Sequence, residues 1–464
     1  MKKVWILILF FLAFPFSTSA FVLGLKSTDN TVENVVKIEK DYSLYLPLIG
    51  FIYDPRDKQD VVAELEKIAK ELGNQRIYHI SLSPNQFSAE EVAKGAFDEQ
   101  YTLFFKTIKR LNLKVIFRTM HEMNGGWYPR GSNPTKFKEA WIHVWNLARS
   151  LGLNQQDILF DFSVNHRDMP TLWTPSQQAK LLHCKDKNPV LEEINKLKKK
   201  KKLTPEEQNS LKTKEKLLQT LNTCPHFEDY YPWEAYVDIV GVTFYNWGKA
   251  TSNRLRKTPA QILNDPEWNT LTRLKALGKP LFIDEVGTTA VWYGGKYQAD
   301  TSRTEFLSET WTARKNQRLK NLSLFLKENQ FMGAVYFNVD YTNGLTLPLV
   351  GEADRAIINT TIGKFYDGFW DLYSSSKSDF SSLLALFGLV KVEVKGKETL
   401  LPRMVAKQIP IIEKLINDKF SDNPQGKSDL YSQLLKAPSG EDSFDQAIQV
   451  LSEHYVLQGS GTAE

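Results

Sequence analysis

Two glutamates stand where apolar, β-forming segments of this chain give way to glycine. Glu122 lies in RTMHEMNGGWYP (118–129), behind the apolar run 115–117, and Glu285 lies in PLFIDEVG (280–287). Packing does not require a carboxylate at such a boundary between strand and loop. Hydrolysis of a glycosidic bond does require two carboxyl groups, one protonated to assist the leaving group and one ionised. The two segments therefore predict a glycoside hydrolase with Glu122 and Glu285 as its catalytic residues.

The surroundings of the two glutamates differ, and the difference assigns their roles. Glu122 is followed by Trp127 and Tyr128, so burial beside aromatic rings is expected to raise its pKa, as a general acid requires. Glu285 is then the nucleophile, and Tyr245 is expected to donate a hydrogen bond that keeps it ionised and aimed. A hydrolase that retains the anomeric configuration needs the two carboxyl groups about 5–5.5 Å apart.

Three neighbouring groups leave alternatives open. Arg118 is expected to support the site, although an ion pair with Glu122 would make that glutamate structural. Asp284 precedes Glu285, and because successive strand residues point to opposite faces, at most one of the two is expected to face the site. His121 fits a supporting position as well as a sugar contact. It does not begin an HExxH zinc motif, because a glycine stands four positions later, and no metal or other cofactor is expected.

Aromatic and polar residues just past the strand ends are candidates for binding the sugar. Flat rings stack against the CH faces of sugars, which favours Trp127 and Trp247, although each would equally fit the core. Asn165 and His166 follow a strand, and capping of the loop is as good an interpretation for that pair. The predicted substrate contacts are His121, Asn124, Trp127, Tyr128, Arg130, Asn165, Tyr245, Trp247 and Phe337.

Strands must bring these residues together, and the chain alternates apolar strand candidates with helical patterns. The seven strand candidates are 46–53, 76–83, 114–122, 157–165, 237–247, 279–287 and 333–340. Amphipathic patterns at 61–72, 97–111 and 136–150 predict helices between them. This alternation predicts a (β/α)₈ barrel, whose active site forms at the C-terminal ends of its strands. The eighth strand is not legible and is expected near Gln86-Phe87. A doubly wound open sheet is the alternative, but no GxGxxG or phosphate loop supports it.

The first twenty residues are typical of a secretory signal. Lys2 and Lys3 precede an apolar core from Trp5 to Phe16, and small residues lead up to Ala20. A retained anchor is the alternative. No later stretch reaches the roughly 20 apolar residues of a spanning helix, so the mature chain is expected to be secreted or periplasmic without stable membrane insertion. Removal of the two lysines takes the net charge from +5 to +3 (+5 − 2), a mild balance that argues neither for nor against a nucleic-acid surface. The expected partner is a polysaccharide substrate and not a nucleic acid, and the sequence does not indicate which proteins bind.

An insertion at 184–224 separates the fifth and sixth strands, and it begins and ends with the two cysteines of the chain. In an exported protein, Cys184 and Cys224 predict a disulfide. Thr204, with proline next and glutamate three positions on, predicts a helix start. A helical hairpin clipped at its base is therefore expected. Its lysine run at 196–202 is interpreted as a solvated face, with binding of an acidic polymer as the alternative.

Composition divides the rest of the chain into three parts. Residues 21–44 are expected to form an N-terminal segment, 45–372 the barrel domain and 373–464 a C-terminal helical extension. The serine-rich stretch SSSKSDFSS (374–382) is interpreted as a linker. No motif in the extension indicates its role.

Three segments together resemble glycoside hydrolase family 26, the β-mannanase family of clan A. They are RTMHEMNGGWYP, VGVTFYNWG and KPLFIDEVG, and the resemblance in order and spacing covers roughly residues 45–370. It implies a retaining (β/α)₈ hydrolase of β-linked polysaccharide, with Glu122 as acid/base and Glu285 as nucleophile. Support falls on His121, Trp127 and Tyr245. Members of the family act on β-1,4-mannan, mixed-linkage β-glucan or β-1,3-xylan.

The chain departs from this family pattern at several points. Arg130 stands where members often have tryptophan, and Phe337 stands where a larger aromatic is usual. The lysine-rich hairpin and the C-terminal extension are not part of the common pattern. Endo-β-1,4-mannanase is the leading prediction. The alternatives are a hydrolase of another β-glycan or of an acidic exopolysaccharide, with which Arg130 would be compatible, and a catalytically dead carbohydrate-binding barrel.

Overall fold

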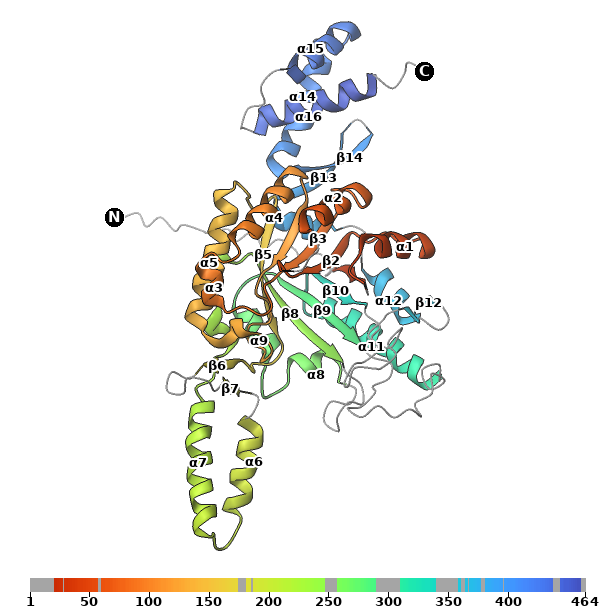
Figure 1. The fold of residues 1–464 in the computed structure, drawn as a ribbon. Helices are drawn as coiled ribbons and strands as arrows, with labels where there is room; N and C mark the ends of the chain where they lie inside the picture. Colours follow the sequence, from red (N-terminus) through yellow and green to blue (C-terminus); the bar gives the residue numbers. More distant parts are fainter. Residues whose placement is uncertain are drawn as a thin grey trace, which may run out of the picture.

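A closed barrel of eight parallel strands forms the centre of the molecule (Figure 1), which confirms the predicted (β/α)₈ fold. The computed structural model describes residues 21–27, 29–56, 60–173, 181–184, 187–246, 257–288, 309–338, 358–359, 364–365, 367–376, 380–394, 396–436 and 443–459. The barrel strands are β1 (Val22–Lys26), β2 (Leu48–Tyr53), β3 (Ile77–Leu82), β4 (Lys114–Arg118), β5 (Ile158–Asn165), β8 (Ile239–Asn246), β9 (Leu281–Thr288) and β10 (Gly333–Phe337). Each strand pairs with the next, and β1 closes the barrel against β10.

The first barrel strand is the one that the sequence did not reveal. β1 lies within the predicted N-terminal segment and pairs with both β2 and β10. Residues near Gln86-Phe87 form no strand and precede the short helix α3 (Ala89–Ala93). The eighth strand predicted there is therefore wrong, and so is a barrel domain that starts at residue 45. Only five residues long, β1 follows an apolar leader so closely that its pattern merges with the leader's.

Amphipathic helices cover the outside of the barrel. They are α1 (Val32–Tyr42), α2 (Val61–Glu71), α4 (Asp98–Arg110), α5 (Pro134–Ser150), α8 (Pro259–Leu263), α9 (Thr270–Ala276), α11 (Glu309–Glu328) and α12 (Asp367–Ser375). Local signals fix their starts: Asp60 caps the N-terminus of α2, and Asn133 with a following proline caps α5. The apolar faces bury large side chains such as Phe104 and Trp141 in the core that surrounds the strands.

Apolar side chains fill the N-terminal end of the barrel interior. This apolar layer consists of one residue from each strand: Val22, Leu48, Ile77, Ile116, Leu159, Ile239, Phe282 and Val335, each at most 1% exposed. The helix α13 (Ser381–Leu386) and the strand β13 (Leu389–Val394) close this end, because Phe380, Leu383, Leu384, Phe387 and Leu389 belong to the same cluster. The predicted linker at 374–382 is therefore wrong: α12 continues to Ser375, and Phe380 is already part of this plug.

Beyond the plug, the chain builds a second hydrophobic cluster. β13 pairs with β14 (Lys397–Pro402) in an antiparallel hairpin. The helices α14 (Arg403–Lys419), α15 (Pro424–Lys436) and α16 (Ser443–Gly459) follow, and they pack through residues such as Ile409, Tyr431 and Leu451. The helices predicted beyond the barrel are thus confirmed, and the β-hairpin is an element that the sequence did not reveal.

The predicted helical hairpin extends from the opposite end of the barrel (Figure 1). It consists of α6 (Lys187–Lys198) and α7 (Pro205–Leu221), and the disulfide between Cys184 and Cys224 joins its base as predicted. The Thr204 side chain accepts a hydrogen bond from the Glu207 backbone while the Glu207 side chain accepts one from Thr204, which explains where α7 begins. The small sheet of β6 (Thr171–Trp173) and β7 (Leu181–His183) precedes it.

No helix in the described ranges combines the length and the apolar character that crossing a bilayer requires. The predicted secretory signal at 1–20 lies outside the described residues.

Candidate active site

The turn after β4 places Glu122 at the C-terminal end of the barrel. β4 ends at Arg118, four residues before Glu122, so the predicted strand 114–122 was too long. Met120 and Glu122 then adopt left-handed backbone conformations, with φ of 49° and 53°, which are uncommon for residues other than glycine and strained for a side chain such as methionine. The backbone N–H of Glu122 donates to the carbonyl of Ser163 on β5 at 2.8 Å. This bond holds the strained turn against the barrel wall.

The Glu122 carboxyl group accepts two hydrogen bonds and is only 8% exposed. Asn165 Nδ2 donates to Oε1 at 2.8 Å, and Trp127 Nε1 donates to Oε2 at 3.0 Å. Burial raises the pKa of Glu122 to about 7, and the negative charge on Glu285 acts in the same direction. A carboxyl group with a pKa near neutrality can both give and take a proton under ordinary conditions.

The Glu285 carboxylate is held by two donors of a different kind. Arg118 Nη1 donates to Oε1 at 2.8 Å, and the Tyr245 hydroxyl donates to Oε2. Arg118 is 1% exposed and also donates to Ser163 Oγ at 3.0 Å and to Thr243 Oγ1 at 3.4 Å. It therefore connects β4, β5, β8 and β9, and it forms an ion pair with Glu285 rather than the alternative pair with Glu122.

Asp284 and Glu285 both face the interior, which corrects the expectation that only one of them could. Along β8, Val242 pairs with Ile283 but Thr243 pairs with Glu285, so Asp284 is an extra residue in β9. A β-bulge of this kind changes the alternation of side chains and re-aims them. Asp284 is completely buried, and its Oδ2 lies 3.9 Å from Arg118 Nε.

His121 supports the same region as a neutral imidazole. Its Nδ1 lies 2.9 Å from Ser81 Oγ, and its Nε2 lies 3.5 Å from the Tyr128 hydroxyl. Burial holds the pKa of His121 well below its ordinary value, and the positive charges of Arg118 and Arg130 lower it further. The contacts with Ser81 and Tyr128 hold the His121 ring at both of its nitrogens.

Two predicted sugar contacts are buried in the framework instead. Arg130 is 1% exposed, donates to the His121 carbonyl at 2.9 Å and stacks 3.6 Å from the centre of the Tyr128 ring. Asn124 is completely buried and donates to the Asn165 carbonyl at 2.8 Å. The structure therefore contradicts a direct sugar contact for both residues, and Arg130 no longer favours a charged glycan.

Three of the remaining predicted contacts, Trp127, Tyr128 and Phe337, are aromatic residues that lie against Glu122, His121 and Tyr245, respectively. Trp127 is 45% exposed while its indole N–H reaches Glu122. Phe337 lies edge-on to Tyr245 with ring centres 5.8 Å apart, and Tyr128 is half-buried beside His121. The structure thus brings the exposed Trp127 close to the paired acids. Trp247 lies outside the described residues.

Lys26 at the end of β1 is a residue of this region that the sequence analysis missed. Its ammonium group lies 4.9 Å from the centre of the Phe337 ring and the residue is 8% exposed. Burial lowers the pKa of Lys26 to about 8, opposed by the negative charges of Glu285 and Asp29. The segment VLGLK is itself an apolar strand that ends in a charged residue, and this signal could have revealed it.

A second cluster of polar side chains, also missed, lies inside the barrel between the apolar layer and Glu285. His79 Nε2 is 3.4 Å from Asp161 Oδ2 and 3.3 Å from Asp284 Oδ1. The three side chains offer ligand atoms within 4.8 Å of one another, a grouping that can suit a metal ion. The sequence signal for this cluster was the presence of polar residues at alternate positions of an otherwise apolar strand, as in RIYHISLS (76–83).

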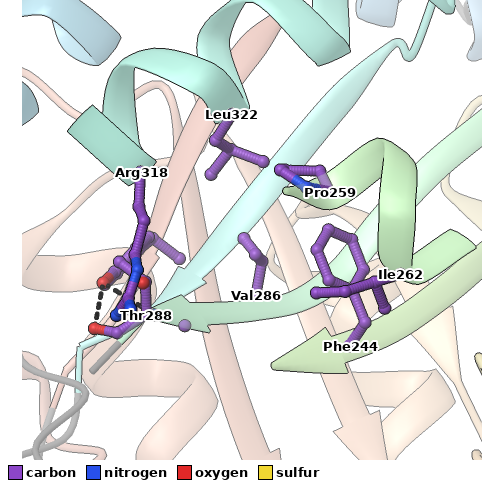
Figure 2. A pocket seen from close by; sticks show the side chains of 9 residues that line it. Phe244, Pro259, Ile262, Val286, Thr288, Arg318 and Leu322 are labelled. Atoms are coloured by element: carbon purple, nitrogen blue, oxygen red, sulfur yellow. Dashed lines mark hydrogen bonds between the residues drawn. The ribbon is translucent and has the colours of Figure 1, made fainter. Parts of the chain in front are cut away.

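A separate apolar cavity lies outside the barrel wall (Figure 2). It is small, with a volume of about 20 Å³, and is lined by Phe244, Pro259, Ile262, Val286, Gly287, Thr288, Arg318, Leu322 and Tyr336. Val286 follows Glu285 on β9 and contributes to this outer cavity, whereas Glu285 bonds to Arg118 inside the barrel. The cavity is therefore distinct from the region of the two glutamates.

Comparisons with known proteins give similarities of fold. No protein-family model matches the sequence, and no curated protein matches it. Solved structures that are similar include GH26A from Muricauda sp. MAR_2010_75, 14% identical with a TM-score of 0.39, over 69% of this chain and 84% of that chain. A Cellulomonas fimi endo-β-1,4-mannanase double mutant is 12% identical with a TM-score of 0.43, over 78% of this chain and 71% of that chain. Fungal β-1,4-galactanases are also similar, at 11% identity and a TM-score of 0.43, over 76% of this chain and 99% of that chain.

Proposed function

We propose that this chain hydrolyses a β-linked polysaccharide by double displacement, with Glu122 as acid/base and Glu285 as nucleophile. The observation that carries the proposal is the contrast between the two buried glutamates. Burial raises the pKa of Glu122 to about 7, whereas Glu285 is paired with Arg118 and hydrogen-bonded by Tyr245. One acid is thus suited to carry a proton while the other is stabilised as an anion, which is the division of labour that retaining hydrolysis needs.

In the first step, Glu285 forms a bond to the anomeric carbon as the glycosidic C–O bond breaks. Glu122 gives its proton to the departing oxygen, so no free alkoxide is released. The result is a glycosyl ester on Glu285 and an ionised Glu122. Tyr245 and Arg118 hold the Glu285 carboxylate in a fixed orientation for this attack.

In the second step, the ionised Glu122 takes a proton from water, and the water oxygen attacks the anomeric carbon. The ester bond to Glu285 breaks and both carboxyl groups return to their starting states. Two inversions at the same carbon leave the configuration unchanged. Asn165 and Trp127 donate to the two oxygens of Glu122, so they stabilise its charged form between the two steps.

β-1,4-Mannan is the substrate that we propose first. The proposal rests on the resemblance of three sequence segments to family 26 and on the half-exposed Trp127 beside the acid. Mixed-linkage glucan and xylan are the competing substrates of the same class. Because Arg130 is buried, the earlier reason for an acidic exopolysaccharide no longer stands.

Reducing-sugar release from mannan, glucomannan, lichenan and xylan tests this proposal. Release from mannan by the wild-type chain, lost in Glu122→Ala and Glu285→Ala, is the expected result. Binding of these polysaccharides without any turnover would instead identify a carbohydrate-binding barrel. Turnover that both variants retain would overturn the assignment of the two glutamates.

We also infer that the chain acts outside the cytoplasm after removal of residues 1–20. The disulfide between Cys184 and Cys224 supports this compartment, because such bonds persist in oxidising surroundings. Expression in a secreting host and intact mass measurement of the exported protein test the inference. A mass that still includes the leader would contradict it.

A further inference from the structure

We propose that Asp161 and Asp284 share one proton inside the barrel, with the negative charge on Asp284, and that Asp284 positions Glu285 through Arg118. This inference rests on the proposed function, since it concerns how the proposed nucleophile is held. Asp161 and Asp284 are thus positioning residues that act through another side chain.

The carboxyl groups of Asp161 and Asp284 lie close together in a buried space inside the barrel. Asp161 and Asp284 are both 0% exposed, and His79, which contacts both, is 2% exposed. Gly241 on β8 makes the arrangement possible, because a Cβ atom there would lie 2.1 Å from both Asp284 oxygens. The barrel therefore carries a glycine where the carboxyl group of Asp284 needs room.

Two buried carboxyl groups this close cannot both remain ionised at little cost, because each charge disfavours the other. Asp161 Oδ1 and Asp284 Oδ2 each lack a hydrogen-bond partner within the described part of the chain, so hydrogen bonds alone fully satisfy neither carboxyl group as an anion. Asp284 differs, because its Oδ2 lies 3.9 Å from the guanidinium of Arg118. The proton is therefore assigned to Asp161 and the charge to Asp284.

The titration behaviour of the two groups follows the same division. Burial and the charge on Asp284 raise the pKa of Asp161 well above its ordinary value. Burial would also raise the pKa of Asp284, but the positive charge of Arg118 and the hydrogen bonds from His79 and Asp161 together outweigh burial and lower that pKa. Burial lowers the pKa of His79, so its imidazole is neutral.

The charged side chains that interact with Glu285 and Arg118 balance when Glu122 carries its proton. Arg118 from β4 and Lys26 from β1 are positive, and both interact with Glu285. Asp284 and Glu285 from β9 are negative. A divalent cation held by His79 and the two aspartates would add positive charge to this set beside Arg118. A proton keeps the set neutral, which favours the proton over a metal ion.

The consequence for the site is a guanidinium fixed between two carboxylates. Arg118 meets Asp284 on its Nε side and Glu285 at Nη1, with distances of 3.9 Å and 2.8 Å. If Asp284 lost its charge, Arg118 would be held less firmly, and its orientation toward Glu285 would loosen. Its uncompensated charge would also act more strongly on Glu122, whose pKa Arg118 lowers.

The test compares two matched variants, Asp161→Asn and Asp284→Asn. Asparagine at 161 keeps a neutral side chain with a donor, whereas asparagine at 284 removes the proposed charge. We expect kcat to fall about tenfold or more further in Asp284→Asn than in Asp161→Asn, with KM changing less, because misplacement of a reacting group acts mainly on kcat. The alkaline limb of the pH–activity profile should move to lower pH in Asp284→Asn only.

Several outcomes would overturn the inference while the proposed function stands. These are equal losses in both variants, a larger loss in Asp161→Asn, or a loss in Asp284→Asn that follows the folded fraction with an unchanged pH profile. A stoichiometric divalent metal in the purified wild-type chain, lost in Asp161→Asn, would replace the proton with a metal site.

Failure of the proposed function would look different, because the wild-type chain would then cleave no glycan. In that case, infrared spectroscopy still decides the inference. In a Glu122→Gln background, where Glu122 with its raised pKa can contribute no band of its own, the carbonyl band of a protonated carboxyl group should be present with Asp161 and lost in Asp161→Asn. Its persistence in Asp161→Asn would overturn the shared proton.

Discussion

The two ends of the barrel interior are built on the same strands but serve different purposes. At the N-terminal end, Ile77 and Leu159 belong to the apolar layer that residues 380–389 cover. Two residues further along the same strands, the inward positions are His79 and Asp161. Alternation along each strand is preserved, yet the interior changes from apolar to ionisable within one step. We therefore expect substitutions at the apolar end to lower the free energy of unfolding and to spare activity. Substitutions at the polar end are expected to lower activity and to spare stability.

The largest expected effect is the loss of activity in Glu285→Ala, at the polar end. Turnover should fall by ~10⁴-fold or more, because no covalent intermediate can form without the carboxylate. Initial rates of reducing-sugar release measure the loss. Added azide should partly restore turnover by attacking the anomeric carbon in the vacated space. Thermal unfolding provides the control, since a variant that fails to fold would also lack activity.

Glu122→Gln should give the next largest effect, a fall of about 10²–10⁴-fold, which is the usual contribution of general acid–base catalysis. The pKa of Glu122 is raised to about 7, so the wild-type group is protonated below that pH and loses its proton above it. Wild-type kcat/KM should therefore decline as the pH rises through about 7. The variant should lack this alkaline limb, and an identical limb in both proteins would assign it to another group.

At the apolar end, Leu384→Ala should destabilise the fold and leave the chemistry intact. Leu384 is completely buried against the apolar layer, and such truncations cost about 2–5 kcal/mol. Denaturant unfolding measures the change in the free energy of unfolding. Leu415→Ala, at a position 58% exposed on α14, is the matched control and should change stability by about 0.5 kcal/mol or less. A large loss of kcat in folded Leu384→Ala would break the comparison between the two ends.

The double variant Cys184→Ser, Cys224→Ser is expected to have little effect on activity and a local effect on stability. The bond closes a loop with a sequence separation of 40, so its loss should cost at most roughly 3–4 kcal/mol. The cost should fall on α6 and α7, and limited proteolysis should cut between them faster. Activity at moderate temperature should stay near that of the wild-type chain, and a loss comparable to that of Glu122→Gln would place the hairpin in the site.

Prediction from sequence worked where local pattern and local chemistry agree. Alternating strands and amphipathic helices indicated the barrel, and the cysteine pair and the Thr204 cap indicated the hairpin that the structure contains. β1 was missed because its few apolar residues follow an apolar leader. The linker predicted at 374–382 overlaps the start of the plug, because serines dominate the local composition while the burial of Phe380 depends on distant strands.

The candidate site was predictable in its residue types and less so in their contacts. Strand ends identified Glu122 and Glu285, but the bulge at Asp284 and the burial of Arg130 depend on pairing and packing between distant segments. Lys26 and His79 carried a signal in the sequence, but their contacts depend on the same long-range pairing. A single charged or polar residue in an apolar strand does not reveal which side chains will contact it once the barrel closes.

The stereochemistry of the first product tests the central claim most directly. Proton NMR during early hydrolysis of the substrate identified by the polysaccharide panel shows the anomeric form of the new reducing end before it equilibrates. Double displacement through Glu285, with Glu122 as acid/base, predicts that the β anomer is formed first. Initial release of the α anomer would contradict the account, because it requires single displacement by water between carboxyl groups spaced too far apart for a covalent intermediate.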